Sequence, residues 1–128
     1  MSFLDDFAAA PDAPWVLRNA SNNQVIARIV EGAFERKSRN RGLLGRSSLP
    51  AGHALVLAPC NSIHTFFMRF AIDVAFLERD GIIRSLRRRV PPWRLHASLR
   101  AFATLECAAG TFDRTDTRAG DRLLFSRE

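Results

Sequence analysis

Short apolar runs, each bounded by residues that favour turns, restrict the fold of this chain more than any other feature. From Trp15 onward the apolar residues come in short groups separated by Gly, Pro, Asn or Asp. This pattern is typical of β-strands. We therefore expect a mainly β protein, a small β-sandwich or half-open barrel of mostly antiparallel strands with one or two short helices. The expected strands cover residues 15–17, 25–30, 54–57, 82–90, 102–107 and 122–125, with two more joined by a corner inside 66–77.

The chain length and composition indicate one domain. The chain has 128 residues, of which 47% are hydrophobic, and a chain of this size can bury a core without disulfides or metals. We expect a single β-rich domain over residues 15–128. Residues 1–14 contain three acids and no base and show only a weak apolar helical face at Phe3, Leu4 and Phe7, so we expect a mobile or loosely docked acidic tail. The charged segment 33–44 is the best helix candidate, because Gly42 and Gly45 would end a helix there.

The dipeptide Asp80-Gly81 predicts a hairpin between two apolar strands. Such a dipeptide favours a two-residue loop with positive φ at both positions. Counting outward from that loop gives three cross-strand pairs: Leu77 with Arg84, Ala75 with Leu86, and Asp73 with Arg88. The last pair would neutralise the Asp73 carboxylate by an ion pair across the two strands.

The N-terminus and the two cysteines indicate the cellular compartment. The N-terminal sequence has neither the basic start nor the apolar segment of a secretory signal, and no stretch reaches the roughly 18–20 apolar residues of a membrane span. We therefore expect a cytoplasmic protein with no membrane-spanning segment. Cys60 and Cys107 lie far apart in the sequence, so in a reducing compartment we expect two free thiols.

Arginine dominates the charge of this chain. Nineteen Lys and Arg residues face 13 acids, which gives a net charge of +6, and a basic surface attracts polyanions. Two basic stretches stand out, 36–46 and 84–94, and the second contains Trp93. Arginines beside an aromatic ring can bind phosphate and stack on a base. However, alternation along a strand would split the second stretch between two faces, which makes a poor groove for nucleic acid.

The segment from Cys60 to Thr65 carries a thiol, an amide, an imidazole and two hydroxyls in one predicted turn. Cys60 with His64 could form a nucleophile and base, for which Asp73 or Glu106 would be the orienting acid. A metal site would need a further ligand from one of the other histidines, His53 or His96. Neither spacing matches a strong motif, so we expect no metal centre and no cofactor.

Asp73 and Glu106 are acids inside apolar strands, where an unpaired carboxylate is costly. Two interpretations remain open from the sequence. The two carboxylates could be satisfied separately by ion pairs or turn amides. Alternatively, both could line one pocket, where they would bind a cation or perform acid–base chemistry.

The order of several motifs resembles a known family, the bacterial and archaeal group called domain of unknown function 192. The similar motifs are Arg41-Gly42-Leu43-Leu44-Gly45-Arg46, Phe66-Phe67-Met68 preceded by His64-Thr65, Ile72 to Leu77 with its Asp-Gly turn, Leu105-Glu106 with Gly110, and Gly120-Asp121. The resemblance covers about residues 25–125 and implies a β-rich sandwich with a short basic helix. It implies no activity. It marks Arg46, Met68, Asp73, Glu106, Gly110 and Asp121 as positions that recur in the family.

These observations lead to one functional prediction and two alternatives. We expect an accessory module that binds an unidentified small molecule or peptide in a polar-rimmed pocket near His64, Asp73 and Glu106. The first alternative is a hydrolase-like enzyme that uses Cys60 or His64 with an acid. The second is binding of nucleic acid or an acidic protein through arginines. The residues expected to bind the ligand are His64, Thr65, Met68, Asp73, Glu106 and Arg46.

Overall fold

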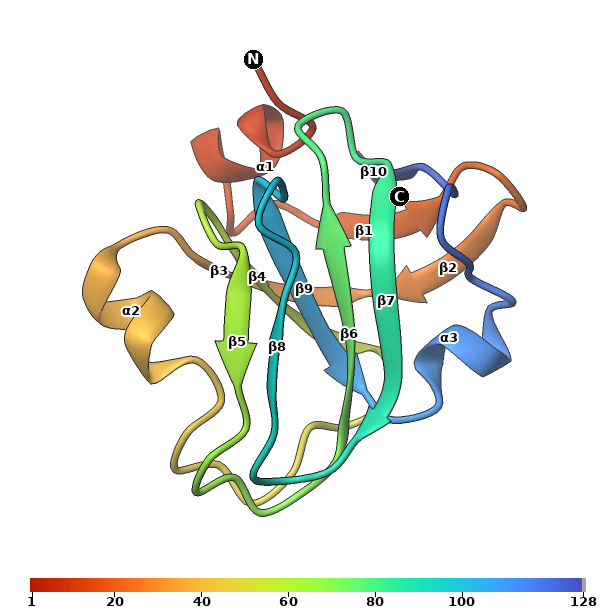
Figure 1. Cartoon of the computed structure of the whole chain (residues 1–128). Coiled ribbons are helices and arrows are strands. Elements are labelled where there is room, and N and C mark those ends of the chain that lie inside the picture. The colour runs from red at the N-terminus through yellow and green to blue at the C-terminus, as the bar shows by residue number, and fades with distance from the viewer. Residues whose placement is uncertain (128) are drawn as a thin grey trace.

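The computed structural model describes residues 1–127, in which ten short strands and three short helices form the fold (Figure 1). The strands are β1 (Trp15–Asn19), β2 (Gln24–Ala27), β3 (Ile29–Ala33), β4 (His53–Leu57), β5 (Ser62–His64), β6 (Ile72–Leu77), β7 (Ile83–Val90), β8 (Leu95–Ala97), β9 (Ala103–Ala108) and β10 (Leu123–Arg127). The helices are α1 (Asp5–Ala9), α2 (Arg36–Arg41) and α3 (Thr111–Arg114). The expected mainly β class is confirmed, with one helix more than the sequence predicts.

The centre of the molecule is a five-stranded sheet in the order β3-β4-β9-β6-β7. Within this sheet only the β3–β4 pair is parallel. The β4–β9, β9–β6 and β6–β7 pairs are antiparallel. Every residue of β6 and the first five residues of β9 are buried, because the sheet is covered on both faces. Alternation along β6 sends Val74 to one face and Asp73 to the other. The two faces therefore belong to two separate apolar clusters.

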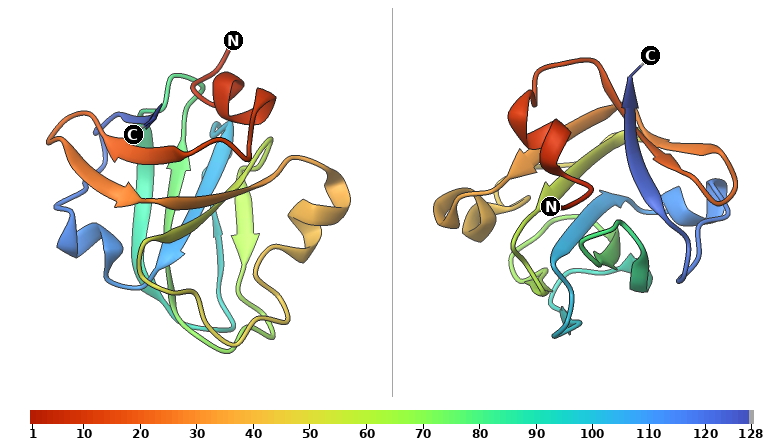
Figure 2. Two further views of the ribbon diagram at one scale, coloured as in Figure 1. Left: turned by 180° about the vertical axis from the view of Figure 1, so that it is seen from behind. Right: turned by 90° about the horizontal axis from the view of Figure 1, so that it is seen from above.

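A different layer covers each face. The three-stranded sheet β10-β1-β2 crosses the central strands on one side (Figure 2), where Leu17, Leu105 and Phe112 are fully buried. The two-stranded β5–β8 ribbon and the segment after α2 cover the other side. Leu43 and Met68 are buried there. This arrangement is a sandwich with an extra ribbon, and it places the turn segment 60–65 over the second face.

The N-terminal segment packs on the domain, in contrast to the mobile or loosely docked tail that the sequence suggests for residues 1–14. Leu4 is 3% exposed and Phe7 is 1% exposed. The Phe7 ring stacks on Phe125 of β10 with ring centroids 4.5 Å apart. The Phe3 amide also donates a hydrogen bond to the Arg79 carbonyl oxygen at 2.7 Å. Helix α1 thus covers one end of the first cluster.

The β6–β7 hairpin forms, but the predicted two-residue loop and its register are wrong. Only Gly81 has a positive φ, of 88°, and the Glu78 amide donates to the Ile82 carbonyl oxygen at 2.9 Å, so the loop is longer. Ala75 lies opposite Leu86 as predicted, but irregularities on both sides of this pair shift the register. The predicted ion pair of Asp73 with Arg88 is therefore absent, and the pairing observed at the hairpin's closed end is Leu77 with Ile83.

The apolar stretch 66–77 contains one strand where the sequence predicts two. Residues 72–77 form β6, whereas 65–71 form turns. Phe67 has a φ of 65°, in the left-handed region, which a strand cannot accommodate. Residues 97–101, where the composition also allowed a short helical turn, are the end of β8 followed by a turn. The strands at 62–64 and 95–97 pair with each other, although the sequence indicated neither.

Candidate functional site

A pocket of about 410 Å³ opens on the second face of the central sheet, between the end of α2 and the β4–β5 loop. Its walls come from elements that are distant in the sequence, because β4 and β9 are neighbours in the sheet and α2 follows β3. Six residues describe its outline: Arg39 and Gly42 at α2, Cys60 in the loop, His64 at the end of β5, Met68 in the following turn, and Glu106 on β9.

Glu106 is the buried acid of this pocket. Its position on β9 lies between Leu55 of β4 and Val74 of β6, at the centre of the sheet. The residue is 3% exposed, and its Oε1 atom has no hydrogen-bond partner among the described residues. Burial raises the pKa of the carboxyl group from 4.5 to about 7, and the nearby positive charge of Arg46 only partly opposes this rise. The group is therefore close to half ionised near neutral pH.

The backbone of Gly42 passes directly over this carboxyl group. Gly42 ends α2 with a φ of 48°, and its amide donates to the Ser38 carbonyl oxygen at 3.0 Å. A Cβ atom at this position would lie 3.7 Å from Glu106 Oε1. A side chain at this position would thus begin in van der Waals contact with the carboxyl group. The adjacent Leu43 is 2% exposed, so this glycine is held in place by the apolar cluster.

The polar rim of the pocket is largely bonded to its own loops. The Cys60 thiol contacts the Ser62 carbonyl oxygen at 3.2 Å. His64 Nδ1 accepts a hydrogen bond from the Phe66 amide at 3.2 Å. Both residues line the pocket, but each bonds within its own segment, and no Cys60–His64 hydrogen bond is formed among residues 1–127. The nucleophile–base pair of the hydrolase alternative is not assembled in this geometry.

Asp73 lies on the opposite face of the sheet from Glu106. It pairs in register with Cys107, whereas its neighbour Val74 pairs with Glu106. The Asp73 carboxylate is fully buried and accepts hydrogen bonds from the backbone amides of Arg89 at 2.8 Å and Phe112 at 2.9 Å. These contacts satisfy both of its oxygens and connect β6 to β7 and to the start of α3. The structure thus brings His64 and Glu106 to one pocket and leaves Asp73 outside it.

Of the other residues expected to bind a ligand, one lines the pocket and two lie outside its lining. Met68 lines the pocket and is 7% exposed. Thr65 is fully buried behind it, where its hydroxyl donates to the Pro91 carbonyl oxygen at 2.8 Å. Arg46 lies outside the lining and forms an ion pair with Glu31 at 2.7 Å, although its charge still acts on Glu106.

The predicted binding set omitted the residues at the end of α2, although Arg39, Arg41 and Gly42 all line the pocket. The available signal was the Gly42 break directly after a basic helix, since a glycine with positive φ lets a backbone approach a ligand closely. Within residues 1–127, no group of three His, Cys, Asp or Glu side chains is placed to hold a metal ion. None of the helices in the same range is long and apolar enough to cross a membrane.

Fold and site together define a small β-sandwich protein with one buried carboxyl group at the base of a polar-rimmed pocket. The family model DUF192, described as "Uncharacterized ACR", matches residues 17–125, so the chain belongs to this family. The match confirms the resemblance noted from the sequence motifs. A search of proteins with curated functions found no significant match.

Two solved structures share the fold. A protein of Sinorhizobium meliloti 1021, described as a "putative transcription regulator", is similar with a TM-score of 0.74 and 25% identity over 85% of this chain and 89% of that one. A protein of unknown function from Novosphingobium aromaticivorans DSM 12444 is similar with a TM-score of 0.74 and 19% identity over 86% of this chain and 82% of that one. Both matches span most of each chain, so the sandwich is the shared unit.

Proposed function

We propose that this protein binds a small polar molecule in the pocket above Glu106, and that the ligand carries a hydrogen-bond donor at one end and an anionic group at the other. One observation carries the proposal: Glu106 Oε1 is buried, lines the pocket and has no partner among the described residues. A buried polar atom without a partner costs about 1–3 kcal/mol. A hydroxyl or amino group of a ligand would supply the missing hydrogen bond.

Arg41 supports the anionic end of the proposed ligand. The residue lines the pocket and is exposed, and it forms no ion pair within residues 1–127. A guanidinium group binds carboxylate or phosphate through two parallel hydrogen bonds. Arg39 is less available, because its Nη1 atom already donates to the Phe34 carbonyl oxygen at 2.7 Å. The pocket volume of about 410 Å³ lies at the lower end of the range for small-molecule sites.

The relative from S. meliloti suggests one setting for such a pocket, since regulators commonly respond to small molecules. That description belongs to the relative, and the proposal for this chain rests on Glu106. The cytoplasmic location expected from the sequence is compatible with this role. The hydrolase alternative gains no support from the contacts of Cys60 and His64.

The first prediction tests this proposal with matched ligands. The purified protein is heated with glucose or glucose 6-phosphate, adenosine or AMP, and serine or phosphoserine, each at millimolar concentration. We expect at least one phosphorylated compound to raise Tm more than its neutral partner does, because the anion pairs with Arg41. Glu106→Gln and Arg41→Ala should each reduce that rise, whereas Arg118→Ala, which removes an arginine paired with Asp116 at 3.0 Å, should not.

Two outcomes would contradict the proposal. One is that no compound in the panel changes Tm for the folded wild-type protein. The other is that a Tm rise persists unchanged in both Glu106→Gln and Arg41→Ala, which would place the ligand elsewhere on the molecule.

A further inference from the structure

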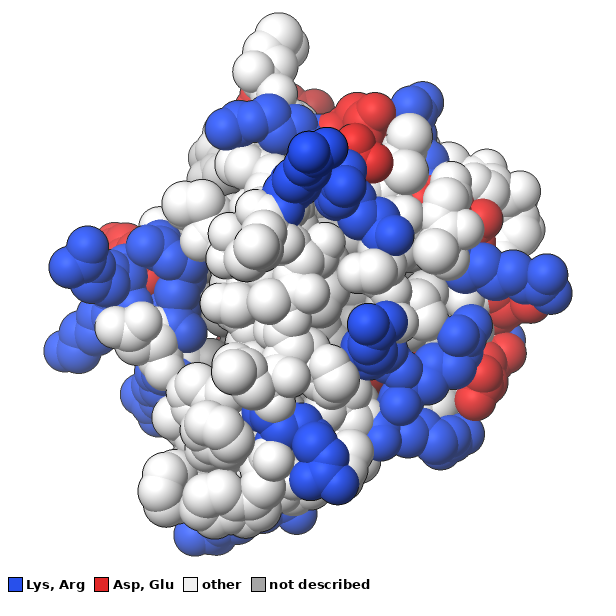
Figure 3. All heavy atoms as spheres, viewed as in Figure 1, with Lys and Arg blue, Asp and Glu red and all other residues white. Residues whose placement is uncertain are grey.

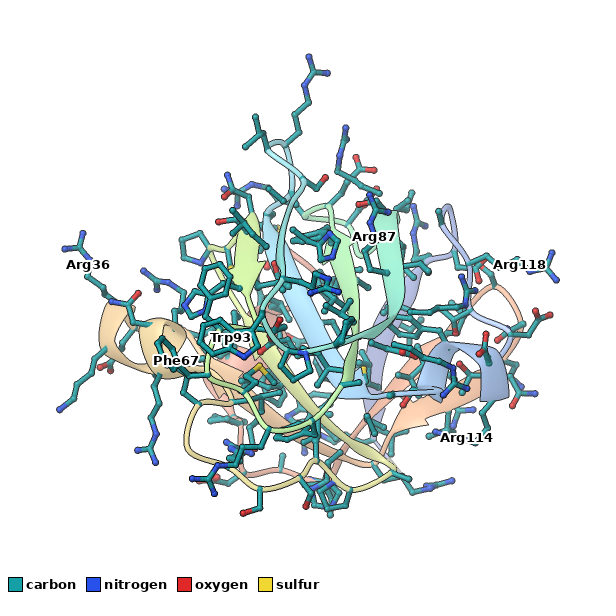
Figure 4. The ribbon with its side chains drawn as sticks, turned by 60° about the horizontal axis from the view of Figure 1, so that its bottom comes forward. Arg36, Phe67, Arg87, Trp93, Arg114 and Arg118 are labelled. Atoms are coloured by element: carbon teal, nitrogen blue, oxygen red, sulfur yellow. The ribbon has the colours of Figure 1, made fainter. Side chains whose placement is uncertain are left out.

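Four aromatic rings form a continuous row on the surface beside the pocket. His64 stacks on Phe66 with ring centroids 5.1 Å apart, and Phe66 lies 5.9 Å from Trp93. Trp93 in turn meets Phe67 edge to face at 4.7 Å. Figure 4 shows Phe67 and Trp93 side by side, left of centre in the view with the bottom of the molecule turned forward. We call His64, Phe66, Trp93 and Phe67 the aromatic row.

Phe67 and Trp93 are exposed at a conformational cost. Phe67 is 73% exposed and Trp93 is 56% exposed, which is unusual for side chains of this size. Both residues have left-handed backbone conformations, with φ of 65° and 70°. Bulky residues rarely adopt this region, and such strain gathers at functional sites. The fold therefore holds two large rings in solvent where burial would otherwise be favourable.

Thr65 holds the two strained turns together. Its hydroxyl donates to the Pro91 carbonyl oxygen at 2.8 Å and accepts from the Arg94 amide at 2.9 Å. Its carbonyl oxygen accepts from the Trp93 amide at 3.0 Å and from the Met68 amide at 3.1 Å. Because Thr65 is fully buried, these bonds fix the positions of the aromatic row before any ligand arrives.

The charged side chains near the aromatic row in the sequence are all basic. Residues 36–72 and 81–105, which include the whole row, contain no Asp or Glu. Arg69 and Arg94 are exposed, lie within two residues of Phe67 and Trp93, and have no ion-pair partner within residues 1–127. In the surface view, the lower part of the molecule shows basic and uncharged side chains, while acidic ones lie at the top, on the right and at the left edge (Figure 3). This surface is complementary to an anionic ligand.

We propose that the aromatic row binds single-stranded nucleic acid, with bases stacked on Trp93 and Phe67 and phosphates against Arg69 and Arg94. Exposed rings next to unpaired arginines are the combination that binds unpaired bases and their backbone. A duplex hides the faces of its bases, so it would meet only the charges. Arg88 and Arg89 add little to this surface, since Asp113 pairs with both. This inference goes beyond the proposed function and does not depend on Glu106.

The second prediction is measured by fluorescence anisotropy of labelled oligonucleotides of about 12 residues at low salt. Single-stranded oligo-dT and oligo-rU should bind more tightly than a duplex of the same length. Trp93→Ala and Phe67→Ala should each weaken single-strand binding by about 10-fold. Leu99→Ala is the matched control, because Leu99 is an apolar side chain, 81% exposed, that has no aromatic ring to stack on a base. Arg94→Ala should reduce the dependence of affinity on salt. Arg118→Ala should not, because Arg118 lies at the right edge of the molecule in Figure 4, away from Phe67 and Trp93.

A spectroscopic readout separates stacking from charge attraction. The chain has two tryptophans, so Trp15→Phe leaves Trp93 as the sole reporter, and its emission should be quenched by oligo-dT or oligo-rU.

Three results would overturn the inference. The first is equal binding of duplex and single strand that Trp93→Ala leaves unchanged, which means charge attraction only. The second is no binding of either oligonucleotide. The third is binding to phosphatidylserine vesicles, but to no oligonucleotide, that depends on Trp93, since the row would then dock on a membrane. Glu106→Gln should leave oligonucleotide binding intact, so failure of the pocket proposal and failure of this one are distinguishable.

Discussion

The position of an acid within its strand determines which hydrogen-bond partners its carboxyl group finds, as Glu106 and Asp73 show. Both are acids in apolar strands of the same sheet, and both are buried. Asp73 receives two backbone amides, whereas Glu106 Oε1 receives none. The difference arises because the two side chains leave the sheet on opposite faces. Asp73 therefore supports the fold, whereas Glu106 lines the pocket with one oxygen that has no partner among the described residues.

The third prediction follows from the pKa of Glu106. Burial raises this pKa from 4.5 to about 7, so the folded state binds a proton that the unfolded state has lost between these pH values. The free energy of unfolding should therefore fall by about 3 kcal/mol as pH rises from below 4.5 to above 7. Glu106→Gln should remove this contribution and make the variant more stable than the wild type at high pH.

Urea unfolding of the two proteins from pH 4 to pH 8.5 measures that difference. Contributions of other titrating groups cancel in the comparison, because the two proteins differ at one position. A stability difference that is constant across this range would show that the carboxyl group is not desolvated.

The sequence identified both acids as unusual but could not assign their roles. Which face each side chain occupies depends on the pairing of β6 with β9, two strands separated by the β7–β8 region of the chain. The only ladder that local sequence suggested was the β6–β7 hairpin, and irregularities in that ladder shift Asp73 away from Arg88. The unpartnered oxygen of Glu106 is a property of the assembled sheet and has no local signal.

At the scale of elements, the turns around Thr65 were harder to predict from the sequence than the central strands of the sheet. The run from Phe66 to Met68 has the composition of a strand, and the sequence predicts one there. The hydrogen bonds of Thr65 to Pro91 and Arg94 instead fold this run into a turn. The strands at 54–57 and 102–107 were predictable within one residue, because each is a compact apolar run with a clear break.

The fourth prediction concerns Thr65. Thr65→Val keeps the shape of the side chain but leaves the Arg94 amide and the Pro91 carbonyl oxygen without their partner, and it should lower the free energy of unfolding by about 1–3 kcal/mol. Thr65→Ser keeps the hydroxyl and should be closer to the wild type. Urea denaturation of the three proteins measures both effects. A Thr65→Val protein as stable as the wild type, with Thr65→Ser the less stable of the two variants, would show that methyl packing, and not the hydroxyl, holds these turns.

At the scale of the whole molecule, the N-terminal segment belongs to the folded unit. It contributes Leu4 and Phe7 to the core, and Phe7 stacks on Phe125 near the other end of the chain. Its apolar residues gave only a weak pattern because a helix of five residues shows hardly more than one turn. The surface that receives it comes from β10, so no local feature of residues 1–14 could reveal the contact.

The fifth prediction tests this packing. Phe7→Ala should lower the free energy of unfolding by about 3–5 kcal/mol, the usual cost of removing a buried ring. Asp12→Ala, at an exposed position of the same segment, should change it little. Thermal unfolding followed by circular dichroism compares the two variants with the wild type. A Phe7→Ala protein as stable as the wild type would mean that the segment is detached in solution.

The acid-free stretches 36–72 and 81–105 leave the surface around the aromatic row without acidic side chains of its own, in a molecule whose net charge is +6. A protein with such an asymmetry is rotated by the field of a polyanion before the two touch. In the complex with single-stranded nucleic acid that we propose, the surface that carries Phe67 and Trp93 would arrive first, and fewer encounters would occur in unproductive orientations. The distribution of acids along the chain would then set how fast a correct encounter forms, separately from how tightly the partners hold afterwards.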